Sequence, residues 1–293
     1  MDLGYSITSF YTPDVGPEEA VGAVLKRARV AADAGYDAIE TGDHHGVGGD
    51  GGYLQNVPTA ARLTQYFDRV AVMFLLPLYH PVLVAEQAGT VAAMADEFDF
   101  WCAAGGGPEQ FDALGVPLEE RGKRFVESAE LVRRLWSEDD VVHDGEFWQL
   151  DGVSIDPKAD ARFCLGGGSE LTVRRAGHRG DAWVANADAS PAFIEQGVDW
   201  FEEEGGGDVI VRRDVLALGD GGLAEDLARG KLEDGYRGWS PEADWVLAGD
   251  AESIAEDLVE LEELGADEVV VRPMSDTHAV ETLETVAEAR ELV

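Results

Sequence analysis

The feature that most constrains the fold of this sequence is an alternation of short apolar segments with longer segments of helical periodicity. Residues 69–76 and 98–104 are almost continuously apolar, as in parallel strands that are covered on both faces. Residues 17–34 and 118–136 instead place apolar side chains at helical spacing, and Gly35 follows the first of these segments. Such repeated units predict parallel strands joined by crossover helices.

The same alternation continues to the end of the chain. Further strands are predicted at residues 3–9, 36–41, 161–165, 182–185, 208–217, 245–247 and 268–271. Further helices are predicted at residues 57–66, 81–97, 169–179, 191–204, 223–232, 251–264 and 278–292. About eight such units, with no break in composition, favour closure into a barrel over an open doubly wound sheet, and a barrel of this kind needs about 250 residues. We therefore expect one α/β domain over residues 1–293, a (β/α)8 TIM barrel.

One segment interrupts the alternation. Residues 141–150 contain Asp144-Gly145 near their centre, which is a turn signal between two strand-like runs. We expect a small hairpin excursion there.

The charge of the chain limits its partners. Its 22 basic and 59 acidic residues give a formal net charge of −37. Nucleic acid and anionic membranes would be repelled. A surface this acidic is suited to molar salt, where the Debye length falls to about 3 Å, and we expect the circular dichroism and melting temperature to depend on KCl.

The location of the protein is predicted from what the sequence lacks. It has no apolar run of the roughly 18–20 residues that span a bilayer, and no basic segment followed by an apolar one at its start. Cys102 and Cys164 have no motif spacing, so we expect them to be reduced and buried in a cytoplasmic protein.

The candidate chemistry is expected at the carboxyl ends of the strands, where barrels carry their active sites. The second strand is followed by Asp43-His44-His45. A histidine titrates near neutral pH, and a neighbouring carboxylate can hold its tautomer, so His44 with Asp43 is a candidate acid–base pair. The alternatives are a metal site and a structural hydrogen-bonding cluster. Adjacent strand residues point to opposite faces and no metal-ligand spacing lies nearby, so we expect no metal.

Two glycine runs also follow strands. Gly166, Gly167, Gly168 and Ser169 precede a helix, whose first amides can face an anion, while Ser169 can cap the helix or contact a phosphate. The alternative is a simple capped turn, since neither a Walker A lysine nor Rossmann spacing is present. Gly105, Gly106 and Gly107 can let a cofactor lie against the backbone, and Glu109 is a second acid or a helix-start carboxylate.

Over nearly its whole length the chain resembles the luciferase-like monooxygenase superfamily. The resemblance is carried by AADAGYDAIETGDHH, YHPVLVAEQAGTVAAM, GGGPEQFDALGVPLEERGKRFVESAELVRRLW, DGEFWQLDG, LGGGSELTVRRAGHRGDAW and LAGDAESIAEDLVELEELGADEVVV, in this order. Two positions depart from it, because many members have R-H-P where this chain has Tyr79-His80-Pro81, and G-R-F where it has Asp96-Glu97-Phe98.

The resemblance implies a cofactor. One branch of the superfamily uses FMN with oxygen, and the other uses the deazaflavin coenzyme F420 for hydride transfer. The Asp43-His44-His45 segment is similar to the deazaflavin branch, which implies that His44 acts at the reaction centre. That branch also implies a bulge with a cis peptide near Met73, Phe74 and Leu75, and cofactor-phosphate contacts from the glycine-rich turn at residues 166–169.

These features together predict a coenzyme F420-dependent oxidoreductase that acts on a small organic substrate. His44 would transfer a proton, oriented by Asp43, with Glu109 as a second candidate. The alternatives are an FMN-dependent monooxygenase on the same barrel and a flavin- or deazaflavin-binding protein without catalysis. Members of the superfamily are often dimers, and halophilic archaea make this deazaflavin, so the resemblance implies a homodimer and an archaeal, salt-adapted origin.

Overall fold

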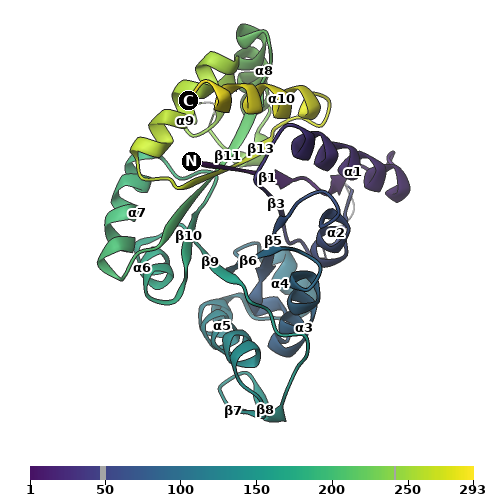
Figure 1. Cartoon of the computed structure of the whole chain (residues 1–293), viewed down its shortest axis with the longest axis vertical. Coiled ribbons are helices and arrows are strands. Elements are labelled where there is room, and N and C mark those ends of the chain that lie inside the picture. Colours follow the sequence, from purple (N-terminus) through teal and green to yellow (C-terminus); the bar gives the residue numbers. More distant parts are fainter. Residues whose placement is uncertain (47–50, 241) are drawn as a thin grey trace. The chain divides into compact units, whose positions relative to one another are not determined.

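A computed structural model of the chain describes residues 1–46, 51–240 and 242–293. The main sheet consists of β1 (Asp2–Ile7), β3 (Ala38–Thr41), β5 (Arg69–Leu75), β6 (Glu97–Ala103), β9 (Arg162–Gly167), β10 (Ala182–Ala185), β11 (Asp208–Ala217), β12 (Leu247–Gly249) and β13 (Glu268–Pro273). The longer helices are α1 (Pro17–Asp33), α2 (Asn56–Leu63), α3 (Pro81–Ala92), α4 (Pro108–Leu114), α5 (Arg121–Ser137), α6 (Glu170–Arg179), α7 (Pro191–Glu203), α8 (Gly221–Glu233), α9 (Ala251–Glu263) and α10 (Ala279–Glu291). Figure 1 shows helices and strands alternating along the chain from purple to yellow.

The strand order confirms the predicted barrel. The hydrogen-bonded order is β10-β9-β6-β5-β3-β1-β13-β11-β12, and β10 pairs in addition with β11. That second pairing closes eight strands into a ring, with the three-residue β12 attached to β11. The ladders at β1–β13, β11–β13, β5–β6 and β6–β9 are parallel, as crossover helices require.

Contacts between Cα atoms group the chain into two compact units. Unit 1 consists of Met1–Ile7, Leu25–Ile39 and Gly166–Val293, and unit 2 consists of Thr8–Val24 and Glu40–Leu165. Each unit is therefore assembled from separate stretches of the sequence.

Unit 1 joins the two ends of the chain. Strand β1 lies beside β13 with Asp2 opposite Glu268, and helices α9 and α10 pack together (Figure 1). Gly4 is required by this pairing, because a Cβ atom at Gly4 would lie 2.8 Å from Cγ2 of Val270. Trp183 is fully buried and donates its indole N–H to the carbonyl of Gly167 at 3.0 Å.

Unit 2 has an aromatic core beside the β5–β6 ladder. Phe100 packs against the rings of Phe74, Trp136 and Phe163. Trp136 in turn donates its indole N–H to the carbonyl of Ala85 at 3.0 Å. The predicted burial of both cysteines is also confirmed, since neither Cys102 nor Cys164 has an exposed side chain.

The cis peptide predicted near Met73, Phe74 and Leu75 is wrong, and no bulge interrupts the pairing of β5 with β6. Strand β5 pairs with β6 without a register shift, from Arg69 opposite Glu97 to Leu75 opposite Ala103. Among the described residues only the bond between Asp156 and Pro157 is cis. Two backbone groups at the end of β5 bond side chains, because the N–H of Leu75 donates to Asp43 at 2.7 Å and the carbonyl of Met73 accepts from Asn56 at 2.6 Å.

Two helix predictions also need correction. Helix α3 ends at Ala92 rather than at residue 97, because the N–H groups of Asp96 and Glu97 already bond the carbonyl of Asp68 at the start of β6. Helix α4 was not predicted. Its signals were present, since Pro108 stands at its first position and Gly115 follows it with a φ of 67°.

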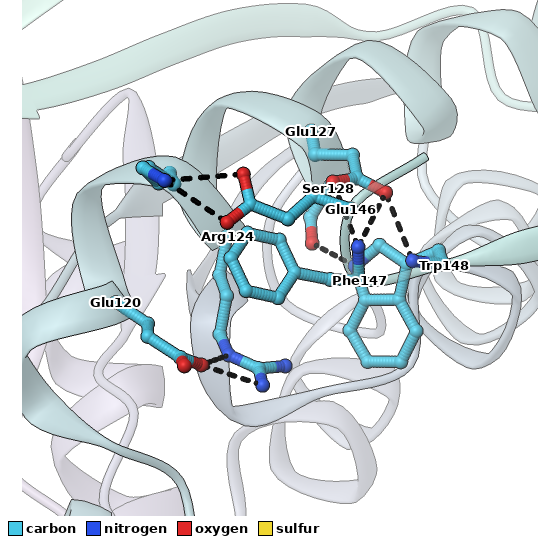
Figure 2. Close-up of polar contacts among 8 residues, drawn as sticks. Glu120, Arg124, Glu127, Ser128, Glu146, Phe147 and Trp148 are labelled. Atoms are coloured by element: carbon cyan, nitrogen blue, oxygen red, sulfur yellow. Dashed lines mark hydrogen bonds and ion pairs between the residues drawn. The ribbon is translucent and has the colours of Figure 1, made fainter. Parts of the chain in front are cut away.

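The predicted hairpin is confirmed, although its second strand extends to Val153. Strands β7 (Val141–Asp144) and β8 (Gln149–Val153) are antiparallel. Figure 2 shows how α5 holds the turn: Glu127 accepts hydrogen bonds from the backbone N–H groups of Phe147 at 3.1 Å and Trp148 at 2.9 Å. The Trp148 indole N–H donates to Ser128 at 3.0 Å. The hairpin is therefore fixed to α5.

Candidate functional site

The strongest candidate site of unit 2 is a hydrogen-bonded cluster around Asp43, two residues beyond β3. The Asp43 side chain is only 1% exposed. Its Oδ2 accepts the backbone N–H of Leu75 at 2.7 Å, and its Oδ1 accepts the hydroxyl of Tyr79 at 2.8 Å. The same Oδ1 lies 2.7 Å from Nε2 of His45. A buried carboxylate, an imidazole and a phenol therefore meet at one point.

Local structure explains this meeting. Asp43 and His45 are two residues apart in the segment that follows β3, and their side chains converge at the 2.7 Å contact. The 3-10 turn η1 (Leu76–Leu78) follows β5 and ends at Tyr79, whose N–H bonds the carbonyl of Leu76 at 3.2 Å. This turn brings the phenol back to the carboxylate. Helix α4 adds a further contact, because the backbone N–H of His45 donates to Oε1 of Gln110 at 2.8 Å.

The cluster has a defined arrangement of protons. Burial, followed by the neighbouring Asp43 carboxylate, holds the pKa of Tyr79 well above its usual value, so the phenol stays neutral. Its one proton goes to Asp43, so its oxygen accepts from His45, whose Nε2 lies 2.5 Å away. The other ring nitrogen of His45 is Nδ1. No described residue provides a hydrogen-bond partner for that atom.

The predicted orientation of His44 by Asp43 is wrong. The side chain of Asp43 contacts His45, Tyr79 and the backbone of Leu75 instead. His44 points to the other face, where its ring stacks on Tyr53 with the centroids 4.1 Å apart. The alternation of side chains along the segment is the physical reason. A role for His44 in proton transfer stays a prediction.

The residues predicted at the third and fourth strand ends take different positions. Met73 and Phe74 are buried, and only Leu75, through its N–H, joins the Asp43 cluster. Gly105, Gly106 and Gly107 form the loop between β6 and α4, and no atom lies within 4 Å of a Cβ built on Gly106. Glu109 is exposed in the first turn of α4, which fits a helix-start carboxylate.

The glycine-rich turn in unit 1 lies at the end of β9. A Cβ atom at Gly167 would lie 2.9 Å from Oγ1 of Thr172, and one at Gly168 would lie 2.6 Å from Nδ2 of Asn186. Ser169 is the N-cap of α6, and its N–H donates to Oγ1 of Thr172 at 3.0 Å. Close packing and capping thus explain Gly167, Gly168 and Ser169. Phosphate contacts at Gly166–Ser169 stay a prediction.

Sequence reasoning missed His45 and Tyr79 as members of the cluster. Tyr79 lies 36 residues from Asp43 in the sequence, and no local pattern joins them. A signal was nevertheless present, since Tyr79 stands where many members of the superfamily have an arginine. In this chain the position holds a neutral phenol that bonds a carboxylate.

Two further findings concern absences. Within residues 1–46, 51–240 and 242–293, no group of three or more His, Cys, Asp or Glu side chains is arranged to hold a metal ion. In the same part of the chain, no helix combines the length and apolar character needed to cross a membrane. Residues 47–50, which follow the Asp43-His44-His45 segment in the sequence, lie outside the described residues.

Comparison with known proteins identifies the family of the chain. The sequence profile of the luciferase-like monooxygenase family matches residues 1–208. The chain belongs to the luciferase-like monooxygenase family. The similar proteins include one named as an F420-dependent glucose-6-phosphate dehydrogenase and one named as a diketocamphane monooxygenase, so their names do not fix one cofactor.

The sequence relatives include both uncharacterised proteins and named enzymes. An uncharacterised protein of Mycobacterium tuberculosis is 34% identical over 112 residues, which is 37% of this chain and 38% of the relative, so the match spans well under half of that relative. The F420-dependent glucose-6-phosphate dehydrogenase of Intrasporangium calvum is 25% identical over 270 residues, covering 87% of this chain and 78% of that enzyme.

Solved structures support the fold. The monooxygenase RslO1 of Streptomyces bottropensis superposes with a TM-score of 0.84 at 18% identity, covering 99% of this chain and 98% of its own. An F420-dependent secondary alcohol dehydrogenase gives a TM-score of 0.80 at 18% identity, covering 99% of both chains.

Proposed function

We propose that this protein is a coenzyme F420-dependent oxidoreductase that acts on a small organic substrate. The observation that carries the proposal is the Asp43 cluster, in which a buried carboxylate holds a histidine and a neutral tyrosine. Hydride transfer to or from a carbonyl or alcohol carbon needs a partner proton, and this cluster can supply or take one. A relative that matches 87% of the chain, from Intrasporangium calvum, is named for F420.

The residues present fit such a cofactor in two respects. The chain leaves open space beside the backbone at Gly106, where a planar ring or tail can approach. The N–H groups of Glu170 and Leu171, the first two of α6, have no acceptor within the helix and can donate to an anionic group without any lysine, whereas the N–H of Thr172 is capped by Ser169. When bound, the deazaflavin supplies the hydride chemistry at its C5 position.

The chain's own residues would handle the proton. Asp43 fixes the imidazole of His45 through Nε2, and Tyr79 keeps that nitrogen in contact with a hydroxyl rather than with water. The Nδ1 atom of His45 then accepts the proton of a substrate hydroxyl during oxidation, or returns it during reduction. His44 is the second candidate, as the resemblance implies.

The proposal is tested with purified protein kept in high salt. Titration with coenzyme F420 and with FMN should give tighter binding of the deazaflavin. Turnover of an identified substrate should fall by about 10²–10⁴ in His45→Ala, which is the range for a lost general acid–base group. His44→Ala separates the two histidines, and His178→Ala, which removes an exposed histidine of α6, is the matched control.

An FMN-dependent monooxygenase is the second candidate function. It is favoured by the TM-score of 0.84 to a monooxygenase, and by 26% identity over 178 residues to 2,5-diketocamphane 1,2-monooxygenase 1 of Pseudomonas putida, covering 56% of this chain and 47% of that enzyme. Tighter binding of FMN than of the deazaflavin would select it. Cofactor binding with unchanged turnover in both histidine variants would reject the proton-transfer role, and binding without any redox chemistry would identify a non-catalytic binding protein.

A further inference from the structure

Unit 1 contains a positively charged cluster in a strongly acidic chain. Asp214 on β11 is the centre of this cluster, and its side chain is only 1% exposed. Its Oδ2 accepts from Nη2 of Arg272 on β13 at 2.5 Å and from Nη1 of Arg237 in η3 (Tyr236–Gly238) at 3.1 Å. The hydroxyl of Tyr236 donates to the same oxygen at 2.9 Å. Two guanidinium groups thus share one carboxylate.

The strand register explains how these groups come together. Asp214 lies directly opposite Arg272 in the β11–β13 ladder, which fixes the first pair. Tyr236 and Arg237 follow α8, and η3 brings them back to the strand ends. Arg212, two residues before Asp214 and therefore on its face, donates to the hydroxyl of Ser6 at 3.2 Å.

Charge is not balanced within the cluster. Each guanidinium has five N–H donors. Arg237 and Arg272 both contact Asp214, and neither contacts a second carboxylate within the described part of the chain. Burial and then the neighbouring Arg272 lower the pKa of Arg237, in spite of Asp214. The cluster therefore has one positive charge in excess, in a protein whose net charge is −37.

The conformation and neighbours of Arg237 point to a binding role. Its φ of 52° and ψ of 13° place it in the left-handed region, which costs free energy for a residue other than glycine and is found preferentially at ligand clamps and active sites. Its guanidinium lies 4.8 Å from the centre of the Trp239 ring. That ring touches Tyr236 and Trp245 edge-on. The guanidinium is thus held by an aromatic surface, and its side chain remains 36% exposed.

We propose that Asp214, Tyr236, Arg237 and Arg272, called here the arginine cluster, bind an oxyanion group of the substrate, a carboxylate or a phosphate. The forked donors of two arginines match the paired oxygens of such a group. Trp239 provides an apolar face for the organic part of the molecule beside it. This inference rests on the proposed function in naming the substrate class, which becomes anionic organic molecules rather than neutral alcohols or ketones.

The test measures anion binding by the protein without cofactor. Inorganic phosphate and acetate are titrated separately by isothermal calorimetry, at constant ionic strength. Saturable binding of at least one ion is expected, and the tighter one indicates a phosphate ester or a carboxylic acid as substrate. Arg237→Gln should weaken binding about tenfold or more, as expected for a lost charge-assisted hydrogen bond. Arg229→Gln is the control, because it removes an exposed arginine of α8 that pairs only with Asp226 among the described residues.

Three results would overturn the inference: no saturation by either ion in the millimolar range, equal binding by wild type and Arg237→Gln, or an equal loss in Arg229→Gln. If Arg237→Gln loses its circular dichroism signal, Arg237→Lys replaces it, with several-fold weaker binding expected and unchanged binding contradicting the inference. Because no cofactor is added, anion binding without deazaflavin binding rejects the proposed function alone. Deazaflavin binding without anion binding rejects this inference alone.

Discussion

The Asp43 cluster of unit 2 and the arginine cluster of unit 1 share a central pair, a buried aspartate and a tyrosine, and differ in their charge. Each centres on an aspartate whose side chain is 1% exposed, and each aspartate accepts a tyrosine hydroxyl, at 2.8 Å from Tyr79 and 2.9 Å from Tyr236. The remaining partners differ. Asp43 has a histidine and a backbone N–H, whereas Asp214 has two arginines.

This difference shows that the neighbours of a buried carboxylate decide its chemistry. A histidine can exchange a proton near neutral pH, so the Asp43 cluster is suited to proton transfer. Arginine does not give up its proton in proteins, so the arginine cluster can only attract an anion. The Asp43 cluster should therefore govern proton transfer, and the arginine cluster should govern anion binding.

Replacing each aspartate by asparagine tests this division with the largest expected effect. Asp43→Asn should lower turnover by about 10²–10⁴, because the histidine loses the carboxylate that fixes its tautomer. Asp214→Asn should lower the free energy of unfolding by about 2–3 kcal/mol, because two partly buried guanidinium groups lose their carboxylate. It should also strengthen phosphate or acetate binding, because the internal competitor is gone. Steady-state kinetics, denaturant melts and calorimetry measure the three quantities, and equal losses of turnover in both variants would break the comparison.

Removing each tyrosine hydroxyl gives a smaller and more specific effect. Tyr79→Phe should reduce kcat by about tenfold, and should alter the pH profile of turnover, since His45 loses a hydrogen-bond partner. Tyr236→Phe should leave kcat unchanged and raise KM for an anionic substrate several-fold. The pair of variants removes the same atom from each cluster, so a kcat effect from Tyr236→Phe, or a pure KM effect from Tyr79→Phe, would contradict the assignment.

A third carboxylate, that of Asp257, extends the comparison because it has more acidic than basic neighbours. Burial, and then the charges of Glu260 and Glu256, raise the pKa of Asp257 on α9 to about 6. This pKa lies above the pKa of Asp257 in the unfolded chain. The stability that Asp257 contributes is therefore present at pH below about 4 and is lost as the pH rises through 6. Asp257→Asn should therefore raise the melting temperature by about 2–4 °C at pH 8 and have little effect at pH 4.

The control for that experiment is Glu284→Gln, which removes one exposed negative charge from α10. An equal increase in both variants would mean that relief of net charge, rather than the surroundings of Asp257, is responsible. An increase for Asp257→Asn that is independent of pH would contradict the raised pKa.

The barrel was predictable because its signal is periodic and local. Strand β11 was predicted to the residue, since two apolar runs, Val209-Ile210-Val211 and Val215-Leu216-Ala217, lie between Gly207 and Gly219. The short α4 was missed, because seven residues give less than two helical turns of pattern. The salt requirement, the cytoplasmic location and the homodimer stay predictions.

The sites were predictable only in part, because their contacts are not local. Asp43 was found from its place after a strand and its histidine neighbours. Its histidine partner was misassigned, although the two-residue alternation already favoured His45. The arginine cluster was missed entirely, since Asp214 is 22 residues from Tyr236 and 58 residues from Arg272 in the sequence. Only the strand register brings these residues together.

Unit 1 combines segments that lie far apart in the sequence, and this determines when its sheet can form during translation. Strand β1 is synthesised before the other strands of the sheet, yet Asp2 pairs opposite Glu268 of β13. All residues of unit 2 have been made once residue 165 has emerged, and its β5–β6 ladder joins segments close in sequence. Strand β1 must wait with one edge uncovered until β13 has been synthesised, which exposes the nascent chain to mispairing over that interval. Its brevity, six residues with a glycine in the middle, limits that hazard.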